Sequence, residues 1–331
     1  MLLLEIDNLS VQFRVREGAG RAKQLRAVDG VSFRVERGES VGLVGESGCG
    51  KTTLGLALLG LASVSGGCVR FDGEDVTRLA GASLRRFRER AQMIFQDPFG
   101  SLNPRMSIGA AIEEVLQVHR AVPRSGRAAR AGELLAQVGL DPQYARRYPH
   151  ELSGGQRQRV GIARALAVRP SLLIADEAVS ALDVSVQVQI LNLMKDLQKA
   201  GDLTYLFIAH DLAVVRYMCD RILVMYLGRI VEEGPAAALF AQPAHPYTVA
   251  LLSAVPDVDK GLRGRHGGSR RIILAGDVPS ATQIPPGCPF HPRCPRAEPV
   301  CRADPPPAFR EVGPARRSAC HFAEQVLAEG K

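Results

Sequence analysis

The stretch Gly45-Glu-Ser-Gly-Cys-Gly-Lys-Thr52 decides the fold, because it fits the pattern G-x-x-x-x-G-K-[ST] at every position. It follows a short apolar run at 41–44 and opens a predicted helix over 52–59, which is the strand, loop and helix order that a phosphate-binding loop requires. We therefore expect backbone N–H groups to converge on phosphate oxygens, Lys51 to reach the β- and γ-phosphates, and the Thr52 hydroxyl to coordinate Mg²⁺. The alternative, a glycine-rich turn with a chance lysine, does not explain the flanking strand and helix.

Further short apolar runs recur along the chain, with helical stretches between them. They lie at 92–95, 172–175, 204–208 and 222–226. Such runs predict the buried strands of a mostly parallel sheet covered by helices, which is the α/β class. Residues 2–14 and 28–35 predict two more strands, with 17–23 as a hairpin tip between them.

Two segments depart from this alternation of strands and helices. Between about 98 and 170 the strand signal disappears, and 110–120 and 127–138 predict amphipathic helices, so we expect a helical subdomain there. Beyond Gly234 clear periodicity is lost and proline becomes dense. We therefore divide the chain into a nucleotide-binding domain at 1–235 and a small C-terminal extension at 236–331.

The bulk composition limits the function classes. The longest apolar stretch, at 54–64, has about 11 residues, whereas a membrane-spanning helix needs roughly 20. The first residues lack the basic start and long apolar core of a signal peptide, so we expect a cytosolic protein. The net charge of +8 is mild for 331 residues, and no basic stripe carries interleaved aromatics, which makes nucleic acid the least favoured partner.

An acidic pair ends the apolar run at 172–175. Asp176, at the strand end, is expected to hold Mg²⁺ directly or through water. Glu177 is placed to orient or deprotonate an attacking water molecule. A solvent-facing acidic pair is the alternative, and a phosphate-binding loop in the same chain argues against it.

A second anion-binding site is predicted at Leu152-Ser-Gly-Gly-Gln156, just before a helix expected over about 157–167. A chain with one phosphate-binding loop has no obvious use for a second γ-phosphate contact of its own. We therefore expect a dimer in which Ser153 of each chain closes on the nucleotide of the other. For this motif taken alone, a helix cap with a glycine-rich turn is also physically sound, but it does not explain the other motifs.

Taken together, these motifs resemble those of the ATP-binding-cassette (ABC) ATPases. Gln96, in Ile94-Phe-Gln-Asp-Pro98, matches the glutamine loop of that family, and Ser180-Ala-Leu-Asp183 matches the loop that crosses the dimer interface. His210 matches the switch histidine that contacts the γ-phosphate, and Phe13 is the expected aromatic that stacks on adenine. The resemblance implies a P-loop NTPase fold of ABC type, with a parallel-sheet core, an antiparallel β subdomain and a helical subdomain.

The resemblance also implies which side chains form the ATP site. The catalytic set is Glu177, His210 and Gln96, and Mg²⁺ is implied at Thr52, Gln96 and Asp176. The residues implied to contact the nucleotide are Gly45, Ser47, Gly48, Cys49, Gly50, Lys51, Thr52, Thr53, Asp176, Ser153, Gly155 and Phe13.

The extension carries a second resemblance. His245-Pro-Tyr-Thr248, 276–280 and 285–290 are similar to the extension of the oligopeptide and dipeptide permease ATPases. This implies an ATP-binding and ATP-hydrolysing subunit of an importer for di- or oligopeptides, at the cytoplasmic face of the inner membrane. The implied partners are a second, related ATP-binding subunit, two transmembrane permease subunits and, indirectly, a substrate-binding protein. Nickel and glutathione importers share the extension and stay open as alternatives, as does a soluble ABC ATPase without a transport role.

Four of the seven cysteines cluster near the end of the chain with the spacing C-x5-C-x6-C-x18-C. They are Cys288, Cys294, Cys301 and Cys320. We expect a [4Fe–4S] cluster here, because four thiolates can complete one and the nearby arginines Arg293, Arg296, Arg316 and Arg317 would form a positive shell. Matching cysteines in some peptide-permease ATPases hold such a cluster, so the resemblance implies the same. Zinc is the first alternative, although the close cysteine pairs usual at structural zinc sites are missing; disulfides and free thiols are the others.

Overall fold

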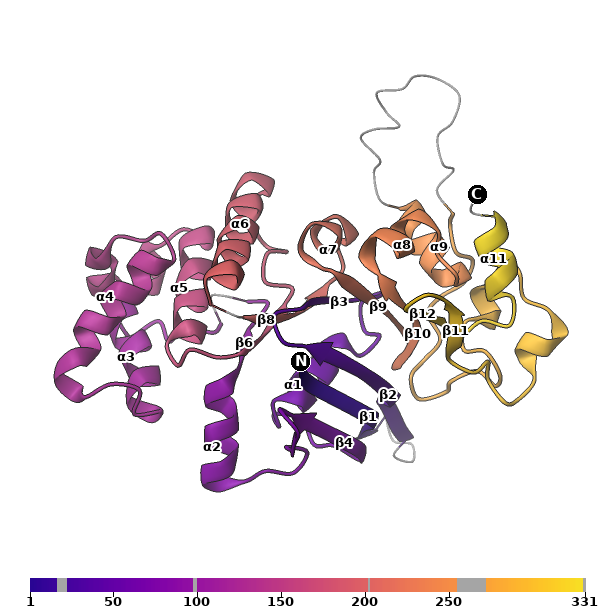
Figure 1. Cartoon of the computed structure of the whole chain (residues 1–331), viewed down its shortest axis with the longest axis horizontal. Coiled ribbons are helices and arrows are strands. Elements are labelled where there is room, and N and C mark those ends of the chain that lie inside the picture. The colour runs from indigo at the N-terminus through magenta and orange to yellow at the C-terminus, as the bar shows by residue number, and fades with distance from the viewer. Residues whose placement is uncertain (17–22, 98–99, 202, 255–271, 330–331) are drawn as a thin grey trace, which may run out of the picture.

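The computed structural model describes residues 1–331 apart from 17–22, 98–99, 202, 255–271 and 330–331. The molecule is elongated, with a helical lobe at one end, a central sheet, and the C-terminal extension at the opposite end (Figure 1). All but the last residue of the predicted hairpin tip lies outside the described residues. Across the described part of the chain, no helix is both long and apolar enough to cross a membrane.

The main sheet has the strand order β11-β12-β10-β9-β3-β8-β7-β6 in the described structure. From β9 to β6 the strands run parallel, and β10, β12 and β11 continue the sheet in antiparallel pairing. The central strands are buried throughout, as expected for parallel strands with helices on both faces. Their bounds are β3 (Ser40–Val44), β6 (Ala91–Ile94), β7 (Leu172–Asp176), β8 (Thr204–Ala209), β9 (Arg221–Tyr226), β10 (Arg229–Pro235), β11 (Arg310–Gly313) and β12 (Arg316–Ser318).

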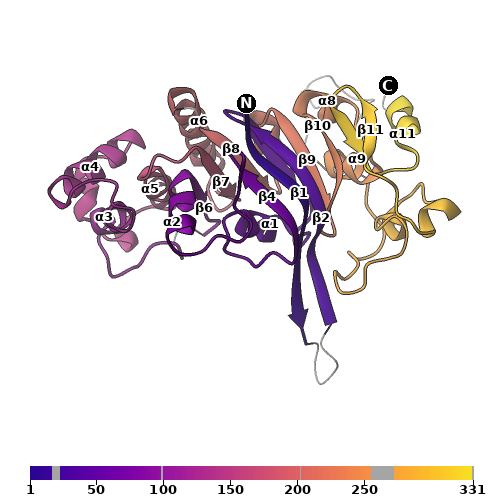
Figure 2. The same ribbon diagram turned by 60° about the horizontal axis from the view of Figure 1, so that its bottom comes forward.

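A second, antiparallel sheet with the order β2-β1-β4-β5 packs against the main sheet (Figure 2). Its long strands bury apolar residues against the main sheet, and among these Leu4 and Phe33 share one apolar cluster with Leu54 of the helix after β3. The bounds are β1 (Leu2–Val15), β2 (Lys23–Glu36), β4 (Gly66–Phe71) and β5 (Glu74–Asp75).

The helices cover the main sheet and form the lobe. The lobe consists of α3, α4 and α5, which bury Ile112, Leu116 and Leu134 between them. The α-helices are α1 (Lys51–Leu58), α2 (Gly81–Arg90), α3 (Ile108–Val118), α4 (Arg127–Gln137), α5 (Gly154–Leu166), α6 (Val184–Gly201), α7 (Leu212–Met218), α8 (Ala236–Ala241), α9 (Pro246–Ser253) and α11 (Ala323–Glu329). Short 3₁₀ helices lie at Arg124–Gly126, Pro142–Arg146, Pro149–Glu151, His291–Arg293 and Pro299–Arg302.

The C-terminal extension is joined to the main sheet. Its strand β12 pairs with β10, with Ser318 opposite Glu232, and β11 pairs with β12 at the sheet edge. The predicted α/β class, with a parallel-sheet core and a separate antiparallel sheet, is confirmed. The addition of two strands from the extension to the main sheet was not predicted.

Candidate active site

The phosphate-binding loop connects the end of β3 to the start of α1. Gly50 caps the helix with φ of 107°, and a Cβ atom there would lie 2.0 Å from the carbonyl oxygen of Ala27. A larger residue at this position would therefore be strained in its backbone and would collide with β2. The loop keeps its course because glycine is the residue that fits.

Lys51 begins α1 and is almost fully buried inside the loop. Its Nζ donates hydrogen bonds to the carbonyl oxygens of Gly45, at 2.8 Å, and Glu46, at 3.0 Å. The backbone carbonyl groups of the loop thus hold the ammonium group in place. Of the other predicted contact residues in the loop, Ser47 and Gly48 are exposed, Thr53 is half-buried, and burial raises the pKa of the Cys49 thiol.

Thr52 and Asp176 meet at the end of β7. The Thr52 Oγ1 donates to Asp176 Oδ1 at 3.2 Å, and burial is the main cause that raises the pKa of Asp176. A hydroxyl and a carboxylate that lie side by side offer the hard oxygen ligands that Mg²⁺ prefers. These two residues therefore fit the predicted magnesium site.

Glu177 is contacted by both of the other residues predicted to be catalytic. Its Oε2 accepts a hydrogen bond from Gln96 Nε2 at 2.8 Å and lies 3.1 Å from His210 Nδ1. The backbone of Glu177 has φ of 45°, in the left-handed region that residues other than glycine rarely adopt. Such backbone conformations are common at functional sites. The backbone N–H of Glu177 donates to Ile208 of β8 at 2.8 Å, which helps to hold the residue in this conformation.

Ser153 and Gly155 lie at the start of α5, in the helical lobe. The Ser153 Oγ accepts from the N–H of Gln156, whose side chain in turn accepts from the N–H of Ser153. A Cβ atom on Gly155 would lie 2.4 Å from Val186. Among the described residues, no hydrogen bond joins Ser153 to the phosphate-binding loop, because its polar atoms bond within the first turns of α5.

Phe13 lies near the end of β1, opposite Leu25 of β2, and its side chain is 41% exposed. The ring is therefore accessible on the antiparallel sheet.

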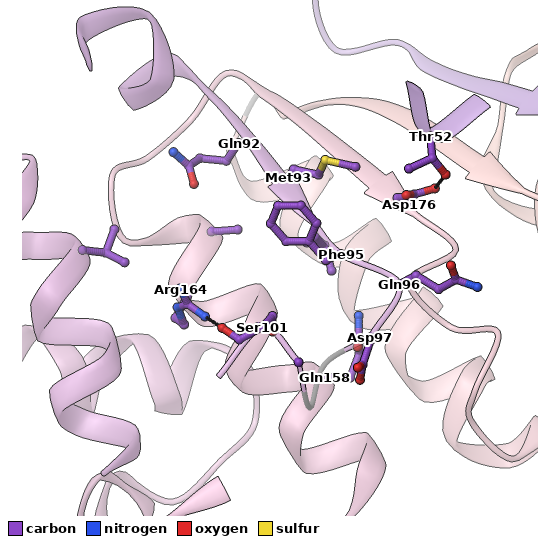
Figure 3. Close-up of a pocket in the computed structure, with 15 residues that line it drawn as sticks. Thr52, Gln92, Met93, Phe95, Gln96, Asp97, Ser101, Gln158, Arg164 and Asp176 are labelled. Carbon is purple, nitrogen blue, oxygen red and sulfur yellow. Dashed lines mark hydrogen bonds between the residues drawn. The ribbon is translucent and has the colours of Figure 1, made fainter. Parts of the chain in front are cut away.

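A cavity of about 510 Å³ extends from the magnesium site towards the helical lobe (Figure 3). Thr52, Gln96 and Asp176 line one part of it, and Gln158 and Arg164 of α5 line another. Gln158 is buried, and its Nε2 has no hydrogen-bond partner among the described residues. The segment that follows β6 therefore borders both the catalytic residues and the lobe.

The predicted iron–sulfur cluster is wrong, and the zinc alternative fails with it. Within the described ranges, which include all four cysteines of the cluster, no group of three or more His, Cys, Asp or Glu residues could hold a metal ion. All four thiols are free. Burial raises the pKa of Cys288 to about 11 and of Cys320 to about 12, which favours the thiol over the thiolate that binds metals.

The arginines near these cysteines do not form the expected positive shell, because carboxylates pair with them. The pairs are Arg293 with Glu46, Arg296 with Glu329, Arg316 with Glu232, and Arg317 with Glu233. The cysteines are small apolar residues of the core instead: Cys288 and Cys301 pack in the main apolar cluster, and Cys320 packs with Ala244 and Ala323.

Comparison with known proteins identifies the family. A family model described as ABC transporter matches residues 28–180, and one described as Oligopeptide/dipeptide transporter, C-terminal region, matches residues 231–301. The oligopeptide transport ATP-binding protein AppF of Bacillus subtilis (strain 168) is 49% identical over 97% of this chain and 97% of its own length. The chain belongs to the ATP-binding subunits of ABC transporters.

Solved structures of this ABC family agree with the fold. The ATP-binding cassette MJ0796, in a dimeric post-hydrolysis state bound to ADP and Pi, has a TM-score of 0.63 and 29% identity, covering 71% of this chain and 99% of its own. The protein cbiO1 of Clostridium perfringens, part of the ABC transporter complex cbiONQ, has a TM-score of 0.62 and 27% identity, covering 72% and 91%. The predicted ABC ATPase family and ABC-type fold are confirmed, and membership implies ATP and Mg²⁺.

Sequence reasoning missed Glu46, which occupies a position that the loop pattern leaves free. Its carboxylate is paired with Arg293, 247 positions further along the chain. No signal in the sequence connects these two residues.

Proposed function

We propose that this ABC family member binds and hydrolyses ATP to energise an importer of di- and oligopeptides. The observation that carries the proposal is the contact of Glu177 with both Gln96 and His210, beside the paired Thr52 and Asp176. A carboxylate in this position is suited to accept a proton from the water that attacks the γ-phosphate. Peptides are favoured as the cargo by the match of the C-terminal region and by the name of the relative AppF.

The roles of the side chains follow from their positions. Backbone N–H groups of the phosphate-binding loop and the Lys51 ammonium bind the phosphates. Thr52 and Asp176, with Gln96 beside them, would hold Mg²⁺, and the bound ion would neutralise charge on the phosphates. Both contacts of Glu177 use Oε2, so Oε1 is the oxygen available to the attacking water. His210, which is largely exposed, is free to reach the γ-phosphate.

The complete ATP site requires a second ATP-binding subunit. Ser153 and Gly155 lie at the N-terminus of α5, where Ser153 is exposed and forms no hydrogen bond with the phosphate-binding loop among the described residues. We infer that they bind the nucleotide held by a partner subunit of related but different sequence, and that Phe13 stacks on adenine.

We also propose that the ATPase works at the cytoplasmic face of the inner membrane with two transmembrane permease subunits and a substrate-binding protein. Residues 1–235 form the nucleotide-binding domain, with the helical subdomain at about 98–170, and residues 236–331 form the extension. A cavity lies between Gln96 and the helical lobe and borders the catalytic residues on one side and α5 on the other. Movement of the lobe on contact with a permease subunit could therefore reach the catalytic residues through this region.

Peptide uptake in cells tests this function. A strain that lacks the chain should regain uptake of a labelled tripeptide with the wild-type chain and not with Glu177→Gln. Glu74→Gln is the matched control, since Glu74 is an exposed carboxylate on β5 and should restore uptake fully. Two membrane-spanning proteins should co-purify with the chain. Restored uptake of nickel or glutathione without peptide would assign the cargo to the alternatives, and purification without membrane proteins would contradict a role in transport.

A further inference from the structure

The C-terminal extension contacts the phosphate-binding loop at Glu46. The Glu46 carboxylate accepts two hydrogen bonds from Arg293, with Nη1 to Oε2 at 2.6 Å and Nη2 to Oε1 at 3.0 Å. The backbone N–H of the same residue donates to the Tyr247 hydroxyl at 2.8 Å. Two residues of the extension, 201 and 247 positions away in the sequence, thus hold both the side chain and the backbone of one loop residue.

These contacts are built into the core. The side chain of Arg293 is 7% exposed, and Tyr247 is fully buried. The ring of Tyr247 packs against Tyr226 and Phe290, with centroid distances of 4.7 and 5.4 Å. Hydrogen bonding to the Glu46 carboxylate is the main cause that raises the pKa of Arg293. A bidentate arginine–carboxylate pair that is buried in this way fixes the orientation of both side chains as well as neutralising their charges.

The residue held by the extension is also one that positions the loop lysine. Lys51 Nζ donates to the carbonyl oxygen of Glu46 as well as to that of Gly45. A shift of Glu46 would therefore move an acceptor of the ammonium group that binds the phosphates. The chain of contacts runs from Arg293 and Tyr247 to Glu46, and from Glu46 to Lys51.

We propose that Arg293 and Tyr247 are positioning residues of the ATP site, which hold Glu46 and through it set the place of Lys51. The extension is then a working part of the phosphate-binding loop. This inference rests on the proposed function in one respect, because it takes the nucleotide to bind at this loop.

Loss of the pair should weaken nucleotide binding and leave the chemical step nearly unchanged. Arg293→Met removes the guanidinium group and keeps a long side chain. It should raise the Kd and KM for MgATP by about tenfold. The value of kcat should stay within about twofold, because the interaction is present both before and during the reaction. Arg293→Lys should lie between this variant and the wild type. Tyr247→Phe removes only the hydroxyl and should raise Kd by about threefold.

Arg296→Met is the matched control. Arg296 lies in the same extension and forms an ion pair, but its partner Glu329 is an exposed residue of α11 and not part of the loop. It should bind MgATP with the wild-type Kd. Thermal unfolding is recorded for all variants; if Arg293→Met does not fold, Arg293→Lys and Tyr247→Phe carry the test.

A double-mutant cycle separates positioning from a general loss of stability. If Arg293 acts through Glu46, the double variant Arg293→Met/Glu46→Gln should bind MgATP no more weakly than the weaker single variant. Additive losses would overturn the proposal, as would folded Arg293→Met and Tyr247→Phe variants with the Kd of the wild type.

Lys51→Ala keeps this test distinct from that of the proposed function. If the wild type binds MgATP, Lys51→Ala does not, and Arg293→Met equals the wild type, the positioning role alone is wrong. If the wild type itself does not bind MgATP, the proposed function fails.

Discussion

The phosphate-binding loop and the cysteine-bearing extension differ in how their geometry arises. In the loop, eight consecutive residues match one sequence pattern, and they carry Lys51 and the backbone N–H groups that are predicted to bind the phosphates. In the extension, the four thiols come from separate short segments, and their surroundings are set by packing against the rest of the chain. A motif whose chemistry depends on contiguous spacing is therefore predictable, whereas a set of like residues spread over a segment is not evidence of a shared ligand.

The largest effect expected in the extension is a loss of stability in acid that depends on His245. The ring is buried at the start of α9, and its Nδ1 accepts from the N–H of Tyr247. Burial lowers the pKa of His245 to about 3, from 6.5. Because the unfolded chain then binds more protons, the stabilisation is complete above pH 6.5 and is lost as pH falls towards 3. Between about pH 7.5 and pH 5 this amounts to about 2 kcal/mol.

The variant His245→Asn isolates this effect, because asparagine can cap the helix and does not titrate. Denaturant unfolding of both chains at the two pH values gives the difference. The carboxylate of Glu232 accepts a hydrogen bond from the backbone N–H of residue 245. Because Glu232 is present in both chains, its own contribution to the acid dependence cancels in the difference. An equal acid dependence in the two chains would show that the imidazole is not held neutral by burial.

A smaller effect is expected for the cysteines. Replacement of Cys288 by alanine should lower the free energy of unfolding by about 1 kcal/mol, because it removes a buried sulfur from a packed cluster. Cys68 on β4 is only half-buried, so Cys68→Ala is the control, with an expected change under about 0.5 kcal/mol. Neither variant should change the metal content, and the purified wild type should carry no iron or zinc in proportion to the chain. Stoichiometric metal that disappears in Cys288→Ala would contradict this description of the extension.

The two regions also show where sequence patterns stop being informative. The strand expected at 41–44 is β3, and the helix expected at 127–138 is α4, since apolar residues recur there with the period of each element. Strand β12 has no such period, because it is a run of three residues, two of them arginines, and it pairs between β10 and the edge strand β11. The partners of Glu46 could not be predicted either, because folding alone brings Arg293 and Tyr247 to the loop.

The most direct test of the account is the rate of ATP hydrolysis by the Glu177→Gln chain in the assembled transporter, measured together with its Kd for MgATP. The account predicts that turnover falls by a factor of order 10² or more, as expected when a positioned base is removed, while binding stays within about twofold of the wild type. The exposed Glu74→Gln control should hydrolyse ATP at the wild-type rate. Near-normal turnover in Glu177→Gln would contradict the assignment of the catalytic site to the carboxylate that Gln96 and His210 contact.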